Sequence, residues 1–119
     1  MQKFPVLFLM FLLCGCVDMG RVGLHPDVKT ASIEGRKAAV EDCLLYEARK
    51  QNFVVEEDSP LSNDTDRFNL EDSSNTLVGW IEVSSSGKHM TDVDVFYAPN
   101  APEVKKAVTT ILSHCKASF

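Results

Sequence analysis

Four cysteines offer the most definite chemistry in this sequence of 119 residues. Cys14 and Cys16 are separated by one glycine and follow an apolar run, whereas Cys43 and Cys115 lie far apart in the chain. A thiol can carry a lipid, pair in a disulfide or act as a nucleophile, and its compartment and surroundings decide among these outcomes. The segment that holds Cys14 and Cys16 therefore bears on the fate of all four thiols.

The amino-terminal segment is typical of a secretory signal peptide. Residues 4–13 are apolar throughout, and Lys3 is the charged side chain before them. A membrane-spanning helix needs about 20 apolar residues, and Asp18 and Arg21 follow too soon for this run to reach that length. A short basic region, an apolar stretch and small residues at its end are the three parts of a signal peptide.

The end of that segment, Leu13-Cys14-Gly15-Cys16, resembles the lipobox of bacterial lipoproteins. In that family a leucine lies three positions before the cleavage point, a small residue lies just before it, and a cysteine follows it. The resemblance implies that signal peptidase II removes residues 1–15 and that the Cys16 thiol carries a diacylglyceryl group. Cys14 then leaves with the signal peptide. An ordinary signal peptide or an uncleaved anchor is the alternative.

A lipidated Cys16 would hold the mature protein at a membrane, because two or three acyl chains give stable anchoring. In Gram-negative members of the family, an aspartate directly after the lipidated cysteine favours retention at the inner membrane. Val17 occupies that position here. The resemblance therefore implies a place in the cell envelope, at the outer membrane and facing the periplasm if the host is Gram-negative.

The length and composition of the rest of the chain predict one small acidic domain. Seventeen acidic side chains against twelve lysines and arginines give a formal net charge of −5. Such a chain is a poor candidate for nucleic acid or for anionic headgroups. Residues 16–29 contain glycines and a proline without periodicity, which predicts a tether. Residues 30–119 are then expected to form a single domain.

Cys43 and Cys115 remain as a pair once the lipobox resemblance accounts for the other two thiols. Cys115 lies on an apolar stripe with helical periodicity and Cys43 on a similar face, so both point at one core. In an oxidising compartment we expect a disulfide, which the chain-entropy model values at about 4 kcal/mol. The alternatives are two buried free thiols or a catalytic thiol, although neither cysteine belongs to a CxxC motif.

Two helices and several strands are expected in the domain. The first helix is predicted from positions 30–32 to about 51, with Gly35 as a weak point, and the second from 102 or 103 to about 116. Residues 53–55, 67–71, 76–85 and 89–98 have strand patterns, and the last two flank a short hairpin connection. The order predicts an α+β fold: a small two-layer domain in which an antiparallel meander sheet of three to four strands is packed by an N-terminal and a C-terminal helix, stapled by one disulfide.

The acidic segment between positions 56 and 75 could supply oxygen ligands to Ca²⁺. Asp64, Asp66 and Glu71 are the candidate ligands, because hard cations prefer carboxylate and carbonyl oxygens. The EF-hand pattern fails, since it requires a glycine at its sixth position and a glutamate at its twelfth. A solvated acidic loop is the favoured interpretation, and no metal or other cofactor is expected.

Trp80, the single tryptophan, lies in a predicted strand. Alternation places Gly79 and Ile81 on one face of that strand and Trp80 on the other. If the helices cover the first face, Trp80, Met90 and Phe96 form an apolar patch away from them, which is a candidate partner-binding surface. The opposite assignment buries Trp80 in the core, the commoner fate of a large aromatic side chain.

Catalytic motifs are missing from the sequence: it contains no nucleophile elbow, no glycine-rich phosphate loop and no HExxH. Enzymatic activity is therefore not expected. The leading hypothesis is a lipid-anchored cell-envelope protein whose small domain binds another protein in an accessory, assembly or inhibitor/immunity role. The alternatives are a small-ligand or cation-binding periplasmic lipoprotein and, less favoured, an envelope hydrolase.

Overall fold

The computed structural model describes residues 21–59 and 64–119. The predicted signal peptide, Cys16 and the start of the tether lie outside the described residues. Among the residues it describes, no helix is long and apolar enough to cross a membrane. The elements are β1 (Asp27–Glu34), α2 (Lys37–Lys50), β2 (Val54–Glu57), β3 (Thr65–Glu71), β4 (Leu77–Gly87), β5 (Met90–Tyr97) and α3 (Pro102–Ala117).

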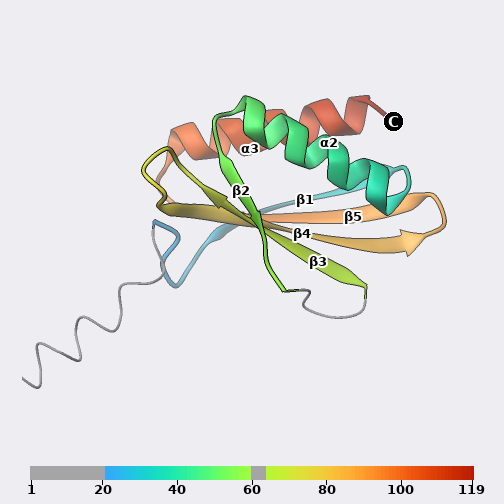
Figure 1. Ribbon diagram of the computed structural model, residues 1–119, viewed down its shortest axis with the longest axis horizontal. Coiled ribbons are helices and arrows are strands. Elements are labelled where there is room, and N and C mark those ends of the chain that lie inside the picture. Colours follow the sequence, from blue (N-terminus) through green and yellow to red (C-terminus); the bar gives the residue numbers. More distant parts are fainter. Residues whose placement is uncertain (1–20, 60–63) are drawn as a thin grey trace, which may run out of the picture.

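The strands form one five-stranded sheet in the order β1-β5-β4-β3-β2, with every neighbouring pair antiparallel. Strands β2 to β5 form a meander. β1, the first strand in the chain, pairs with the other side of β5. Both helices lie on one face of this sheet (Figure 1). The predicted two-layer α+β fold is confirmed, with five strands in place of the three to four expected.

The fifth strand is β1, and it corrects the prediction for the amino-terminal part of the domain. A helix beginning at positions 30–32 is wrong, because residues 27–34 pair with β5 from Asp27 opposite Tyr97 to Glu34 opposite Met90. The side chains of β1 alternate accordingly, with Ile33 fully buried between exposed neighbours. The strand also begins inside the range that the sequence predicted as tether.

Gly35 is the residue that ends β1 and allows α2 to begin. Its φ is +151°, a backbone conformation that L side chains rarely adopt. A Cβ atom at this position would lie 2.8 Å from Cδ1 of Phe119 and 3.1 Å from Cγ2 of Val40. The glycine that weakened the predicted helix is therefore the connection between a strand and a shorter helix.

The core lies between the sheet and the two helices. On β5 the predicted alternation is confirmed, because Thr91, Val93, Val95 and Tyr97 are buried and the side chains between them are half-buried. The helices contribute their own apolar stripes to the same core. The core residues of α2 and α3 include Val40, Leu44, Ala48, Val104, Val108, Ile111, Leu112 and Cys115.

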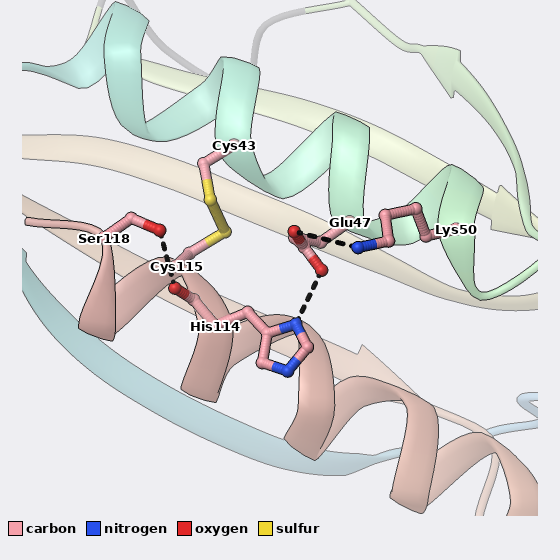
Figure 2. The surroundings of a disulfide bond; sticks show 6 residues. All are labelled: Cys43, Glu47, Lys50, His114, Cys115 and Ser118. Atoms are coloured by element: carbon pink, nitrogen blue, oxygen red, sulfur yellow. Dashed lines mark hydrogen bonds and ion pairs between the residues drawn. A yellow bond between two sulfur atoms is a disulfide. The ribbon is translucent and has the colours of Figure 1, made fainter.

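A disulfide between Cys43 and Cys115 joins the two helices, as predicted (Figure 2). The two Cα atoms lie 5.8 Å apart, and the cysteines are separated by 72 positions in the chain. Beside the bridge, Nδ1 of His114 lies 2.8 Å from Oε1 of Glu47, a glutamate that is only 8% exposed. The bridge and this contact hold α2 against α3 at two neighbouring points.

Candidate functional site

The face of the sheet opposite the helices is the candidate functional site, and we refer to it as the open face. On β5 it consists of the half-buried side chains that alternate with the core residues. The register with β1, β3 and β4 extends it across the sheet. Its central residues are Val28, Thr30, Ser32, Arg67, Asn69, Trp80, Glu82, Ser84, Asp92, Asp94 and Phe96.

Trp80 and Phe96 form a stacked aromatic pair on the open face. They lie directly opposite each other in the β4–β5 register. Their ring centroids are 5.1 Å apart, with 16° between the ring planes. Both side chains are half-buried, and the helix-facing neighbour Ile81 is fully buried. Of the two interpretations of Trp80, the structure therefore supports a patch away from the helices over packing in the core.

The indole of Trp80 is held in place by two polar neighbours. Its Nε1 donates a hydrogen bond to Oε2 of Glu82 at 3.0 Å. The guanidinium carbon of Arg67 lies 4.4 Å from the ring centroid, which is a cation–π contact. The Nε of Arg67 in turn donates to Oδ1 of Asn69 at 3.2 Å. These contacts fix the orientation of the indole ring.

Val28 extends the aromatic pair, whereas Met90 does not belong to it. Val28 on β1 lies directly opposite Phe96 and is 46% exposed. Met90 is on the same face but six residues along β5 from Phe96, which corresponds to about 20 Å. It lines a separate hollow with Glu34 at the end of β1. The predicted group of three is therefore a pair joined by Val28, and the sequence missed Val28 because it did not predict β1.

Carboxylates border the aromatic pair. Glu82 and Asp94 occupy directly opposite positions in the β4–β5 register, although like charges at such positions destabilise a sheet. Asp92 and Asp94 also line a shallow hollow of about 480 Å³ on this face. Asp92 accepts a hydrogen bond from the hydroxyl of Ser32 at 2.7 Å. The open face is thus an aromatic centre with carboxylates along its border, where Arg67 lies opposite Glu82 and Lys116 lines the hollow beside Asp92 and Asp94.

The structure does not bring the calcium candidates Asp64, Asp66 and Glu71 together. Asp66 and Glu71 lie near opposite ends of β3, and the Nζ of Lys37 lies 3.1 Å from Oδ2 of Asp66. Lys37 also donates a hydrogen bond to the backbone oxygen of Asp64 at 3.1 Å. Within residues 21–59 and 64–119, no group of three or more His, Cys, Asp or Glu side chains could hold a metal ion.

Asp66 instead pairs with a carboxyl group of α2. Burial and a hydrogen bond to Asp66 raise the pKa of Glu41 to about 8. The same hydrogen bond, with the Lys37 ammonium as a further cause, holds the pKa of Asp66 below its ordinary value. Near neutral pH, Glu41 therefore keeps its proton and donates it to the ionised Asp66, which joins α2 to the start of β3.

Glu41→Gln is expected to flatten the dependence of stability on pH. Because the folded pKa of Glu41 lies above its unfolded value, its contribution is fully present below about pH 4.5 and is lost as the pH rises through about 8. At pH 9 we expect the variant to exceed the wild type by about 1 kcal/mol, a figure reduced for solvent screening at this partly exposed pair. Urea unfolding at about pH 5 and at about pH 9 measures the difference.

The matched control is Asp42→Asn, which removes an exposed carboxylate from the same helix. It should leave the slope of the wild-type pH profile unchanged. If Glu41→Gln shows that same slope, the protonated Glu41–Asp66 pair does not exist in solution.

Comparisons with known proteins add no family assignment. A scan against protein-family models found no match, and a search of curated proteins also found none. The open face and the amino-terminal motif are therefore the features of this chain that bear on its function.

Proposed function

We propose that this chain is a lipid-anchored protein of the bacterial cell envelope whose small domain binds another protein through the open face. The role is that of an accessory, assembly or inhibitor/immunity protein. The observation that carries the proposal is the stacked Trp80–Phe96 pair, which is half-buried on a sheet face that no described helix covers. Tryptophan is enriched in protein-binding hot spots, because its rigid ring buries a large area at a small entropic cost.

The chemistry of the border points to a partner segment that carries arginine or lysine beside an apolar side chain. Glu82 and Asp94 face each other across the ladder with like charge. A cation placed between them would relieve their repulsion, and an arginine could bind both carboxylates with its planar fork. The apolar neighbour would cover Phe96 and the exposed Val28. A positively charged protein surface therefore complements this face.

Photo-crosslinking tests the location of the binding surface. A photo-reactive amino acid in place of Ser84, on the open face, should capture one partner at a defined stoichiometry in living cells. The same group in place of Tyr46, which is 62% exposed on α2, should not capture that partner. Capture from position 46 and not from position 84 would place the interface on the helical layer and refute the proposal.

The lipid anchor has a separate test. Cys16→Ala should leave the precursor uncleaved and move the protein out of the fraction of acylated membrane proteins, because the resemblance assigns both the cleavage site and the acyl chains to Cys16. Metabolic labelling with a palmitate analogue and intact-mass measurement follow the change.

Cys14→Ala is the matched control for this variant. Cys14 lies two positions before Cys16, at a position where the lipobox accepts different residues. The variant should therefore preserve labelling, mature mass and membrane association. If Cys16→Ala also preserves all three, the chain is not a lipoprotein.

A further inference from the structure

We propose that the outer edge of β1, together with the groove between β1 and α3, binds an extended acidic segment of a partner protein by strand addition. This site lies at the edge of the sheet, and the charged side chains that line its groove are lysines, whereas Glu82, Asp92 and Asp94 lie on the open face. It does not depend on the function proposed above.

The outer edge of β1 is free to pair with a further strand within the part of the chain that the structure describes. β1 is the terminal strand in the order β1-β5-β4-β3-β2 and spans eight residues. Within the described residues it pairs with β5 alone. Thr30, Ser32 and Glu34 are exposed. An edge of this length presents a row of backbone donors and acceptors to a further strand.

The direction of those backbone groups follows from one hydrogen bond. The N–H of Gly35 donates to the carbonyl of His89 at 2.6 Å, and these two residues continue the β1–β5 register. In an antiparallel ladder, hydrogen-bonded positions alternate. The odd-numbered residues of β1 therefore bond to β5, and the N–H and C=O groups of Val28, Thr30 and Ser32 point away from it.

An independent hydrogen bond on the other side of β5 agrees with this assignment. The N–H of Ala98 donates to the carbonyl of Val78 at 2.9 Å, in continuation of the β4–β5 register. Even-numbered residues of β5 therefore bond to β4. The backbone groups of the odd-numbered residues of β5 then point toward β1, where they bond to the odd-numbered residues of that strand.

A groove beside this edge can receive the side chains of an added strand. It measures about 350 Å³ and lies between β1 and α3. Ala31 and Leu112 give it apolar lining, and the two charged side chains that line it are both lysines, Lys29 and Lys116. Lys116 also lines the hollow on the open face, so it lies at the rim of β1. In a protein with a net charge of −5, this groove is locally basic.

The charge of the groove selects the occupant. Alternate side chains of an added strand would enter it, and carboxylates at those positions would meet Lys29 and Lys116. A second copy of this chain is a poorer occupant, because two-fold pairing of β1 with itself brings two basic grooves together. An extended segment with acidic residues at alternate positions therefore fits best.

The experiment measures peptide binding to the full chain in detergent micelles. The probe is a fluorescent octapeptide of alternating valine and glutamate, compared with a valine–lysine peptide and with a valine–glutamate peptide that is N-methylated along one edge. We expect the acidic peptide to bind, and both comparison peptides to bind at least about tenfold more weakly. N-methylation removes donors while it keeps the charge, so it separates strand addition from simple charge attraction.

Two variants test the protein side. Thr30→Pro removes an outward N–H that makes no bond to β5, so the sheet should form and the affinity should fall by about tenfold or more. Lys116→Glu should weaken the acidic peptide to a similar extent, whereas Lys88→Glu, in the β4–β5 turn, should not. Hydrogen exchange should show that the amides of Thr30 and Ser32 become protected when the peptide binds.

Four results would overturn the inference. They are no binding of the acidic peptide at millimolar concentration, equal binding of the N-methylated peptide, unchanged affinity in Lys116→Glu, and a dimer of the protein alone that Thr30→Pro disrupts. The last result would assign the edge to a second copy of this chain. If Thr30→Pro does not fold, the N-methylated peptide and Lys116→Glu decide the outcome.

Discussion

Replacing Cys43 and Cys115 together by alanine is expected to lower the free energy of unfolding by about 4 kcal/mol. The bridge joins residues 72 positions apart, so it removes many conformations from the unfolded chain. The cysteines also join the two helices that cover the sheet (Figure 2). Because small domains are stabilised by only about 5–15 kcal/mol, a loss of this size is a large part of the total.

Urea unfolding of the full chain in detergent measures this loss, with the oxidised wild type as the reference. Reduction of the wild type should reproduce most of it, whereas the double variant should no longer respond to a reductant. Equal stability of wild type and double variant would mean that the helices are held by packing alone.

Gly79→Val is expected to prevent cooperative folding or to cost at least about 3 kcal/mol. A Cβ atom on Gly79 would collide with the backbone oxygen of Phe96 and lie 3.2 Å from the Cα of Tyr97. Both contacts are with the backbone of the neighbouring central strand, which cannot move without opening the β4–β5 ladder. Since Gly79 precedes Trp80, the same distortion would disturb the aromatic pair.

Gly87→Val is the matched control on the same strand. A Cβ at that position would meet only the Cβ of Met90, at 4.0 Å, among the contacts within 4 Å. Thermal unfolding should show a change of less than about 1 kcal/mol for this variant. Similar losses for the two variants would show that the close approach of β5 to Gly79 does not limit stability.

The parts of the fold that the sequence predicted are those with strong local periodicity. The stripe of α3 and the alternation of β4 and β5 specify their elements without reference to the rest of the chain. Cys115 lies on the core-facing stripe of α3. Its pairing with Cys43 could be predicted because the lipobox resemblance accounts for Cys14 and Cys16 and leaves these two thiols as a pair. In these elements the apolar positions that the sequence pattern predicts are the positions that are buried in the fold.

β1 could not be predicted in this way. Thr30, Ala31 and Ser32 are small and suit a helix or a strand, and the strand is defined by its pairing with β5, more than 50 positions away. The helix that follows gives no clear starting signal either, because its N-cap is Arg36 and forms no side-chain cap hydrogen bond. Because no stronger N-cap signal follows, the sequence pattern predicts the start of the helix at Thr30 or Ser32.

The residues of the open face could be predicted only in part from the sequence. Alternation placed Trp80 and Phe96 on one side of their hairpin, but it could not determine which side the helices cover. That depends on the path of α2 across the sheet between β1 at one edge and β2 at the other (Figure 1). The contact between Arg67 and Trp80 depends on the β3–β4 register, and the short alternating run at positions 67–71 does not by itself reveal which residues of β4 it faces.

The most direct test of the central claim is the affinity of the crosslinked partner for Trp80→Ala, with Tyr46→Ala as the matched control. The proposal predicts that Trp80→Ala weakens binding by about 2 kcal/mol, or roughly 30-fold. Tyr46→Ala removes an exposed aromatic side chain from α2 and should leave the affinity unchanged. Circular dichroism should confirm that both variants are folded. If Trp80→Ala binds as tightly as the wild type, the open face is not the binding surface.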